Sequence, residues 1–192
     1  MAASPTEDRI LIVGDSLSAE YGLSRGSGWV ALLEKKLVAG GRRAIVVNAS
    51  ISGDTTAGGR SRLPVLLRER KPTIVVIELG GNDALRGLPL ESTKANLLAM
   101  ARAAKAAGAR VLIIGMQLPP NYGRQYGAEF AGLFAQIASD QRAGLVPFML
   151  RGVADVADAE SWFQADRIHP LARAHPTILG NVWPALEPLL AR

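Results

Sequence analysis

The sequence contains no cysteine, which excludes disulfide bonds, thiolate metal sites and a cysteine nucleophile. Histidine is scarce, so any chemistry that needs an imidazole must use one of only two residues, His169 and His175. Long apolar runs are also missing, because Arg, Lys, Gly or Pro interrupts each of them at about the length of a strand. We therefore expect no stable insertion into a membrane.

A basic stripe with interleaved aromatic residues is absent too. The net charge is +5, but the 22 Lys and Arg residues are scattered, and the densest cluster, residues 68–71, has the character of a polar helix end. Nucleic-acid binding is therefore not expected, although the charge permits attraction to anionic substrates or membrane surfaces. Residues 1–8 lack the basic start and apolar stretch of a signal peptide, and we expect them to be disordered or an added start.

The chain is long enough for one domain with a sizeable core, and residues 1–192 show no repeat, low-complexity stretch or linker. Near-continuous runs rich in Val and Ile are typical of parallel strands that are covered on both faces. Four such runs occupy residues 10–13, 44–47, 74–77 and 111–114, and 145–146 is a shorter fifth candidate. Helical patterns lie between and after them, at about 29–38, 60–70, 93–107, 124–142 and 175–190. This alternation predicts an α/β fold, a right-handed parallel sheet with helices on both faces.

The unusual residues of the chain fall directly after the predicted strands. Ser16 follows the first strand, residues 50–55 the second, 80–83 the third and 116–120 the fourth. Because the carboxyl ends of parallel strands share one edge of a sheet, these loops should converge on one crevice.

Each of these features also has a plain structural interpretation. A serine after a strand often caps a helix or forms a turn, and Gly80-Gly81-Asn82-Asp83 by itself indicates a turn. His169 is more informative, because Asp166 lies three residues before it and Pro170 restricts the backbone after it. His175 has no such neighbour, and we interpret it as the start of the last helix.

Taken together, these residues predict a nucleophilic site. Ser16 would be the nucleophile, His169 the general base and then acid, and Asp166 the group that orients the imidazole. The backbone N–H groups of Ser16 and Gly53 and the side-chain amide of Asn82 would form the oxyanion hole.

The same residues resemble the sequence blocks of a known family. Gly14-Asp15-Ser16-Leu17, Gly53, Gly81-Asn82-Asp83 and Asp166-x-x-His169, in this order, are similar to the four blocks of the SGNH hydrolases, the GDSL lipases and esterases. The resemblance implies a flavodoxin-like, three-layer α/β/α fold with a five-stranded parallel sheet. It also implies the catalytic triad Ser16, Asp166 and His169, with Gly53 and Asn82 as oxyanion donors, and no metal or cofactor.

A narrower resemblance involves residues 47–55, 78–87 and 117–123, which look like those of bacterial multifunctional acyl-CoA thioesterase, arylesterase and lysophospholipase enzymes. In that group the loop matching residues 84–89 moves on acyl binding and the loop around 117–120 lines the acyl groove. Ala84 departs from the glycine expected there, which bears on the mobility of the first loop. The resemblance implies a periplasmic or secreted protein, although this chain shows no signal peptide and a cytoplasmic location stays open. We also expect a monomer. The residues expected to bind the substrate are Leu17, Leu85, Leu88, Gln117, Leu118 and Pro119.

The sequence therefore predicts a serine hydrolase that cleaves aryl esters, acyl-CoA or lysophospholipids through an acyl-enzyme. A carbohydrate O-deacetylase on the same scaffold is an alternative, but the leucine-rich loops after the third and fourth strands favour acyl chains over sugars. A non-catalytic flavodoxin-like ligand-binding module or lipid carrier is a second alternative. A nucleotide-binding version of it is disfavoured, because the chain has no glycine-rich phosphate loop.

Overall fold

The computed structural model describes residues 7–191, which contain one sheet of five parallel strands in the order β2-β1-β3-β4-β5. This is the strand order of a flavodoxin-like doubly wound sheet, as expected. The strands are β1 (Asp8–Gly14), β2 (Ala44–Asn48), β3 (Ile74–Glu78), β4 (Arg110–Ile114) and β5 (Gly144–Val146).

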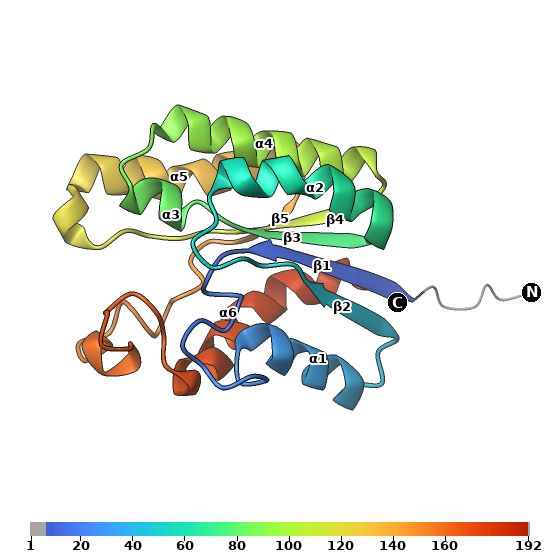
Figure 1. The fold of residues 1–192 in the computed structure, drawn as a ribbon, viewed down its shortest axis with the longest axis horizontal. Coiled ribbons are helices and arrows are strands. Elements are labelled where there is room, and N and C mark those ends of the chain that lie inside the picture. Colours follow the sequence, from blue (N-terminus) through green and yellow to red (C-terminus); the bar gives the residue numbers. More distant parts are fainter. Residues whose placement is uncertain (1–6, 192) are drawn as a thin grey trace, which may run out of the picture.

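Helices cover both faces of the sheet and complete the predicted three layers (Figure 1). One face holds α1 (Trp29–Ala39) and α6 (His175–Leu186). The other face holds α2 (Thr56–Arg70), α3 (Gly81–Leu85), α4 (Leu90–Ala106) and α5 (Arg124–Gln141). Short 3-10 turns lie at Pro120–Tyr122, Ala159–Trp162, Ala172–Ala174 and Glu187–Leu189. No helix within residues 7–191 is long and apolar enough to cross a membrane.

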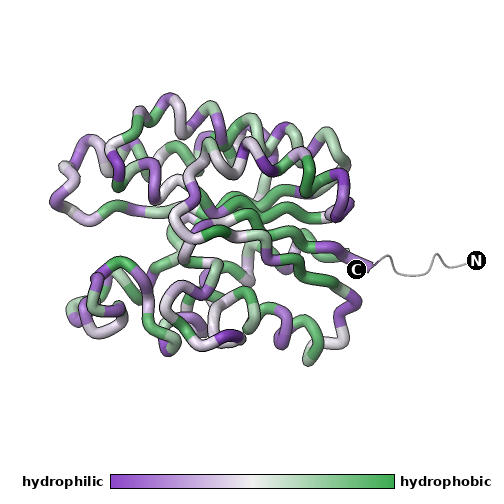
Figure 2. Tube along the Cα trace, in the orientation of Figure 1, coloured by the Kyte–Doolittle hydropathy of each residue, from purple (hydrophilic) through white to green (hydrophobic). Residues whose placement is uncertain are grey.

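The central strands form the core because side chains on both of their faces are covered. The apolar residues 10–13 of β1 and 74–77 of β3 are completely buried. Figure 2 shows the apolar strands in the middle and polar residues along the outer sides of the helices. The edge strand β2 is less covered, and its Ile45 is exposed.

Several boundaries differ from the sequence prediction; helix α4, for example, starts at Leu90 and not at 93. Helix α2 starts four residues before the predicted position 60, at Thr56, and the Thr55 hydroxyl caps it by accepting a hydrogen bond from the Gly58 N–H. The segment predicted as a turn at 80–83 turns only at Gly80, whose φ is +120°, and continues as helix α3 from Gly81. The last helix ends at Leu186, where a 3-10 turn containing Pro188 replaces the helical pattern.

Asp8 connects the two ends of the described chain at the edge of the sheet opposite the predicted site. Its carboxylate pairs with the Arg110 guanidinium at 2.6 Å and accepts hydrogen bonds from the Thr73 hydroxyl and the Ala191 N–H. Residues 1–8 were predicted to be disordered or an added start, and residues 1–6 of this segment lie outside the described residues. The prediction is wrong for Asp8, which is buried and is the first residue of β1.

Candidate active site

Ser16 lies directly after β1, where the chain leaves the sheet between β2 and β3. The strand order reverses at this point, and ligands in open α/β sheets bind in the crevice that such a reversal opens. The turn is held by Asp15, whose carboxylate oxygen Oδ1 accepts the Leu17 N–H at 3.0 Å. The Ser16 side chain is consequently presented at the carboxyl edge of the sheet.

The structure brings Ser16, His169 and Asp166 into one hydrogen-bonded line. His169 Nε2 lies 2.8 Å from Ser16 Oγ, and His169 Nδ1 lies 2.7 Å from Asp166 Oδ2. A carboxylate on Nδ1 fixes that nitrogen as the donor, which leaves Nε2 to accept the serine proton. The spacing along the sequence is 153 residues between the serine and the histidine, so only the fold brings them together.

A compact loop holds the histidine and the aspartate in this arrangement. Phe163 and Pro170 form an isolated antiparallel bridge, and the Gln164 N–H donates to the His169 carbonyl at 2.8 Å. Arg167 lies between Asp166 and His169 with a φ of +58°, a left-handed conformation that is strained for a residue other than glycine. The Tyr21 ring packs against the imidazole with a centroid separation of 4.2 Å.

Asp166 is kept in its charged form by the groups around it. Its small degree of burial acts to raise its pKa, but hydrogen bonds from the His169 backbone N–H, the His169 ring and the Ile168 N–H lower the pKa to about 2. The carboxylate therefore remains negative across the physiological range and can stabilise a positive charge on the imidazole.

Two of the predicted oxyanion donors have free N–H groups. Within the part of the chain that the structure describes, the backbone N–H groups of Ser16 and Gly53 have no acceptor. Gly53 adopts a φ of +79°, which favours glycine, and its carbonyl accepts a hydrogen bond from Arg86 Nη2 at 2.8 Å. This bond fixes the peptide group between Gly53 and Asp54, while the Gly53 N–H, which belongs to the preceding peptide group, stays available.

Asn82 lies at the same edge, but its amide is already engaged. Nδ2 donates to Asp15 Oδ2 and to the Asp54 carbonyl, each at 3.0 Å. These bonds connect Asn82 to the residue before Ser16 and to the residue after Gly53, so the three predicted donors share one neighbourhood. They also use both amide hydrogens, and an oxyanion would have to share or replace one of them.

Two carboxyl groups are buried close to Ser16, in Asp15 and Glu78. Glu78 ends β3 and accepts hydrogen bonds from the Ser18 hydroxyl at 2.7 Å and the Asp15 N–H at 3.3 Å. Burial, followed by the charge of Asp15, raises the pKa of Glu78 well above its usual value, and burial raises the pKa of Asp15 to about 6. A Cβ on Gly14 would lie 2.7 Å from Glu78 Oε2, so this packing requires a glycine there.

The predicted substrate-binding residues are only partly accounted for. Leu85, Leu88, Gln117 and Pro119 are exposed, whereas Leu17 and Leu118 are partly buried. Gln117 lines a cavity of about 350 Å³ together with residues from β5, the segment after it and α6, but none of the other five predicted residues lines that cavity. The acyl groove therefore stays a prediction.

His175 lies outside the hydrogen-bonded line of Ser16, His169 and Asp166. It is buried, and its Nδ1 accepts the Trp29 N–H at 3.0 Å, which connects α6 to the first residue of α1. Burial lowers its pKa from 6.5, against the opposing effects of the Glu20 charge and of a hydrogen bond to the Pro170 backbone. Nor does the described part of the chain hold any cluster of acidic or histidine residues suited to a metal ion.

Sequence reasoning missed several residues of the site. It did not find the roles of Asp15 and Glu78 as acceptors, the packing of Tyr21 on His169, or the contact of Arg86 with Gly53. Glu78 offered one signal, because an acidic residue at the end of a fully apolar strand must be buried and needs polar partners.

Comparisons with known proteins identify the family of this chain. The profile of the GDSL-like Lipase/Acylhydrolase family matches residues 12–176. The chain is 54% identical to the Esterase TesA of Pseudomonas aeruginosa over 94% of this chain and 89% of that protein. It is 41% identical to Thioesterase 1/protease 1/lysophospholipase L1 of Escherichia coli K12, over 95% of this chain and 85% of that protein.

A solved structure supports the same relationship. The crystal structure of TesA superposes with a TM-score of 0.91 at 53% identity and covers 95% of this chain and 100% of the solved one. The resemblance inferred from the four sequence blocks is confirmed, and so is the α/β fold. The chain belongs to the GDSL-like lipase/acylhydrolase family.

Proposed function

We propose that this protein is a serine hydrolase that cleaves carboxylic esters and thioesters through an acyl-enzyme, with Ser16, His169 and Asp166 as its triad. The observation that supports this most directly is the unbroken line of hydrogen bonds from Ser16 Oγ through the imidazole to Asp166. Relatives named esterase, thioesterase and lysophospholipase support the reaction class.

Acylation begins with attack of Ser16 Oγ on the acyl carbonyl carbon while His169 Nε2 takes the hydroxyl proton. The imidazolium that forms is stabilised by the Asp166 carboxylate. The negative charge on the carbonyl oxygen is received by the N–H groups of Ser16 and Gly53 and by the Asn82 amide. His169 then gives its proton to the departing alcohol or thiol, and the acyl group remains bonded to Ser16.

Deacylation repeats these steps with water as the nucleophile. His169 takes a proton from the water, which attacks the acyl carbon, and the tetrahedral species uses the same three donors. Collapse returns the proton to Ser16 Oγ and releases the carboxylic acid. No step in this sequence requires a group other than the chain's own residues and water.

The test is covalent labelling of the nucleophile. A phosphonate or sulfonyl fluoride should label Ser16, and Ser16→Ala should lose both the label and essentially all hydrolysis while keeping the thermal unfolding midpoint of the wild type. Activity within about tenfold of the wild type would contradict the proposal, because loss of a nucleophile costs several decades of rate.

The substrates proposed for this chain are aryl esters, acyl-CoA and lysophospholipids, and a hydrolysis panel of the three classes compares them directly. We also propose that the protein is a monomer that acts in the periplasm or outside the cell. Size-exclusion chromatography and cell fractionation test these two points.

A further inference from the structure

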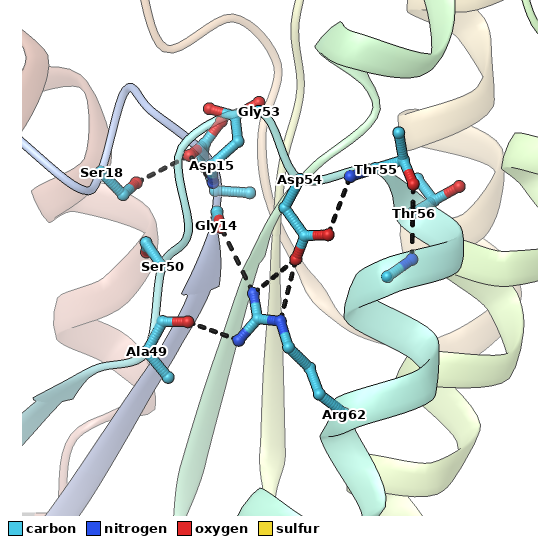
Figure 3. A network of polar contacts seen from close by, with 12 residues as sticks. Gly14, Asp15, Ser18, Ala49, Ser50, Gly53, Asp54, Thr55, Thr56 and Arg62 are labelled. Atoms are coloured by element: carbon cyan, nitrogen blue, oxygen red, sulfur yellow. Dashed lines mark hydrogen bonds and ion pairs between the residues drawn. The ribbon is translucent and has the colours of Figure 1, made fainter. Parts of the chain in front are cut away.

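Arg62 of helix α2 connects three separate segments beneath the predicted site (Figure 3). Its Nε and Nη2 atoms both lie 2.9 Å from Asp54 Oδ2. Nη1 donates to the Ala49 carbonyl, and Nη2 lies 3.4 Å from the Gly14 carbonyl. One guanidinium therefore binds the end of β1, the chain just after β2, and the loop that follows Gly53.

This ion pair is largely shielded from water. The side chains of Arg62 and Asp54 are only 20% and 12% exposed. Buried charges lose much of their hydration, and this cost offsets the attraction between them. The ion pair alone is therefore weak evidence that Arg62 stabilises the fold. Its geometric effect is more informative, because the planar guanidinium imposes fixed directions on all of its acceptors.

The three segments are those that must be aligned for catalysis. The Gly14 carbonyl belongs to the residue two positions before Ser16, and it also accepts the Ile51 N–H at 3.0 Å. Asp54 directly follows Gly53, and its own carbonyl accepts the Asn82 amide. Arg62 thus ties the nucleophile's strand to the loop that carries Gly53 and accepts the Asn82 amide.

The chain around Asp54 is shaped to receive its carboxylate. Oδ1 accepts the Thr55 N–H at 3.0 Å, while Oδ2 faces Arg62. A Cβ on Gly58 would lie 1.9 Å from Oδ1, so a side chain at that position of α2 would collide with the carboxylate. The position of Asp54 is consequently fixed from two sides, by the start of α2 and by the guanidinium.

We propose that Arg62 is a positioning residue that acts through Asp54, setting where the Gly53 N–H and the Asn82 amide lie relative to Ser16. The proposal rests on the proposed hydrolase function and adds a residue to its machinery. The polar contacts of Arg62 are with Asp54, Ala49 and Gly14, and none of them is with a reacting atom. Its effect should appear in the transition state, because the donors it aligns act on charge that exists only there.

The test compares Arg62→Gln and Arg62→Lys with Arg60→Gln as a matched control. Arg60 lies on the same helix, and its guanidinium donates a hydrogen bond to the Asn96 side chain, at 3.1 Å on the exposed surface. Arg62→Gln should lower kcat by about 10- to 100-fold with KM within about twofold, because small misplacement of catalytic groups costs on this order. Arg62→Lys should recover part of the loss, since one ammonium can pair with Asp54 but cannot reach every acceptor. Arg60→Gln should match the wild type.

A double-mutant cycle separates positioning from general damage. If Arg62 acts through the oxyanion donors, the loss caused by Arg62→Gln should shrink clearly when Asn82 is already alanine. The acid limb of the pH–rate profile should not move, because the His169–Asp166 pair is untouched. Full additivity, an equal loss in KM, or a kcat within twofold of the wild type would overturn the inference.

Folding and the parent proposal are controlled separately. Thermal unfolding is measured for every variant, and if Arg62→Gln does not fold, Arg62→Lys and Asp54→Asn are compared on the same criteria. Failure of Ser16→Ala to abolish hydrolysis would refute the proposed function, whereas loss of activity in Ser16→Ala with an unaffected Arg62→Gln would refute only the role of Arg62.

Discussion

At the scale of single residues, changes at the partner of His169 and at His175 have opposite expected effects. Asp166→Asn should lower kcat by about 10⁴-fold, because an amide can hold the imidazole in the wrong tautomer and cannot stabilise its positive charge. His175→Ala should leave kcat close to the wild type but cost about 1–3 kcal/mol of stability, because the buried Trp29 N–H would lose its acceptor. Steady-state kinetics and urea unfolding of both variants measure this. A crippled His175→Ala that is fully folded would show that the wrong histidine was chosen.

Asn82 gives a second expectation at this scale. Asn82→Ala should lower kcat by about 10²–10³-fold and leave KM nearly unchanged, because an oxyanion donor acts on charge that forms in the transition state. Initial rates over a range of substrate concentrations separate the two constants. A raised KM with an intact kcat would instead make Asn82 a residue that binds the ground state.

The sequence was sufficient to nominate the triad but not its supporting contacts. Ser16, Asp166 and His169 have side chains whose chemistry is specific, and each follows a recognisable pattern. The partners of Asn82 could not be foreseen, because Asp15 and Asp54 lie 67 and 28 residues away from it. The contacts of Arg62 could not be foreseen for the same reason, because in the sequence it looks like an ordinary basic residue on a polar helix.

At the scale of elements, the prediction concerns the loops after β3 and β4. If Leu85, Leu88, Leu118 and Pro119 form an apolar wall, each buried methylene contributes about 0.8 kcal/mol, roughly fourfold per carbon in kcat/KM. Rates should climb from acetyl to medium-chain esters and then level off or fall. Leu118→Asp should flatten the climb and spare acetyl esters.

A control for that series is Val38→Asp, which places the same charge on an exposed residue at the end of α1. It should leave the chain-length dependence intact. If acetyl esters are the best substrates and octanoyl esters are poor, the acyl groove is wrong and a carbohydrate O-deacetylase is favoured.

The strands and long helices were predictable because their burial patterns are simple. A short run of Val and Ile such as residues 74–77 of β3 is typical of a strand that is covered on both faces. Helix α3 was not predictable, because its five residues are too few for a periodic pattern and begin with glycine. The turn at Gly80 and the capping of α2 by Thr55 depend on backbone angles that the residue types only permit.

At the scale of the whole molecule, stability should depend on pH through buried groups. The pKa of His175 is lowered in the folded state, so the unfolded chain takes up its proton first and stability should fall as the pH drops below about 6.5. Asp15 has the opposite effect, because its pKa is raised to about 6 in the folded state. Its contribution to stability should therefore increase as the pH falls from about 6 to about 4.

Urea unfolding at several pH values measures how the free energy of unfolding changes with pH and so checks the direction of both effects. The stability advantage of the wild type over His175→Asn should shrink as the pH falls below 6.5 and be constant above it. Asp15→Asn should gain stability relative to the wild type as the pH rises from 4 to 6.

We also propose that residues 1–192 form one domain, for which both circular dichroism and tryptophan fluorescence should report one coincident transition.

The contacts of the Asp8 carboxylate indicate that the chain can be circularly permuted. Because the carboxylate binds the Ala191 N–H at 2.6 Å, the first strand and the last described residues are already neighbours, at the edge of the sheet away from Ser16. A short glycine-rich linker between these ends, with new termini opened in the exposed turn at Ala107–Gly108, should give a circular permutant that folds and hydrolyses esters. Such a permutant would show that the fold and its active site do not depend on which residue is synthesised first.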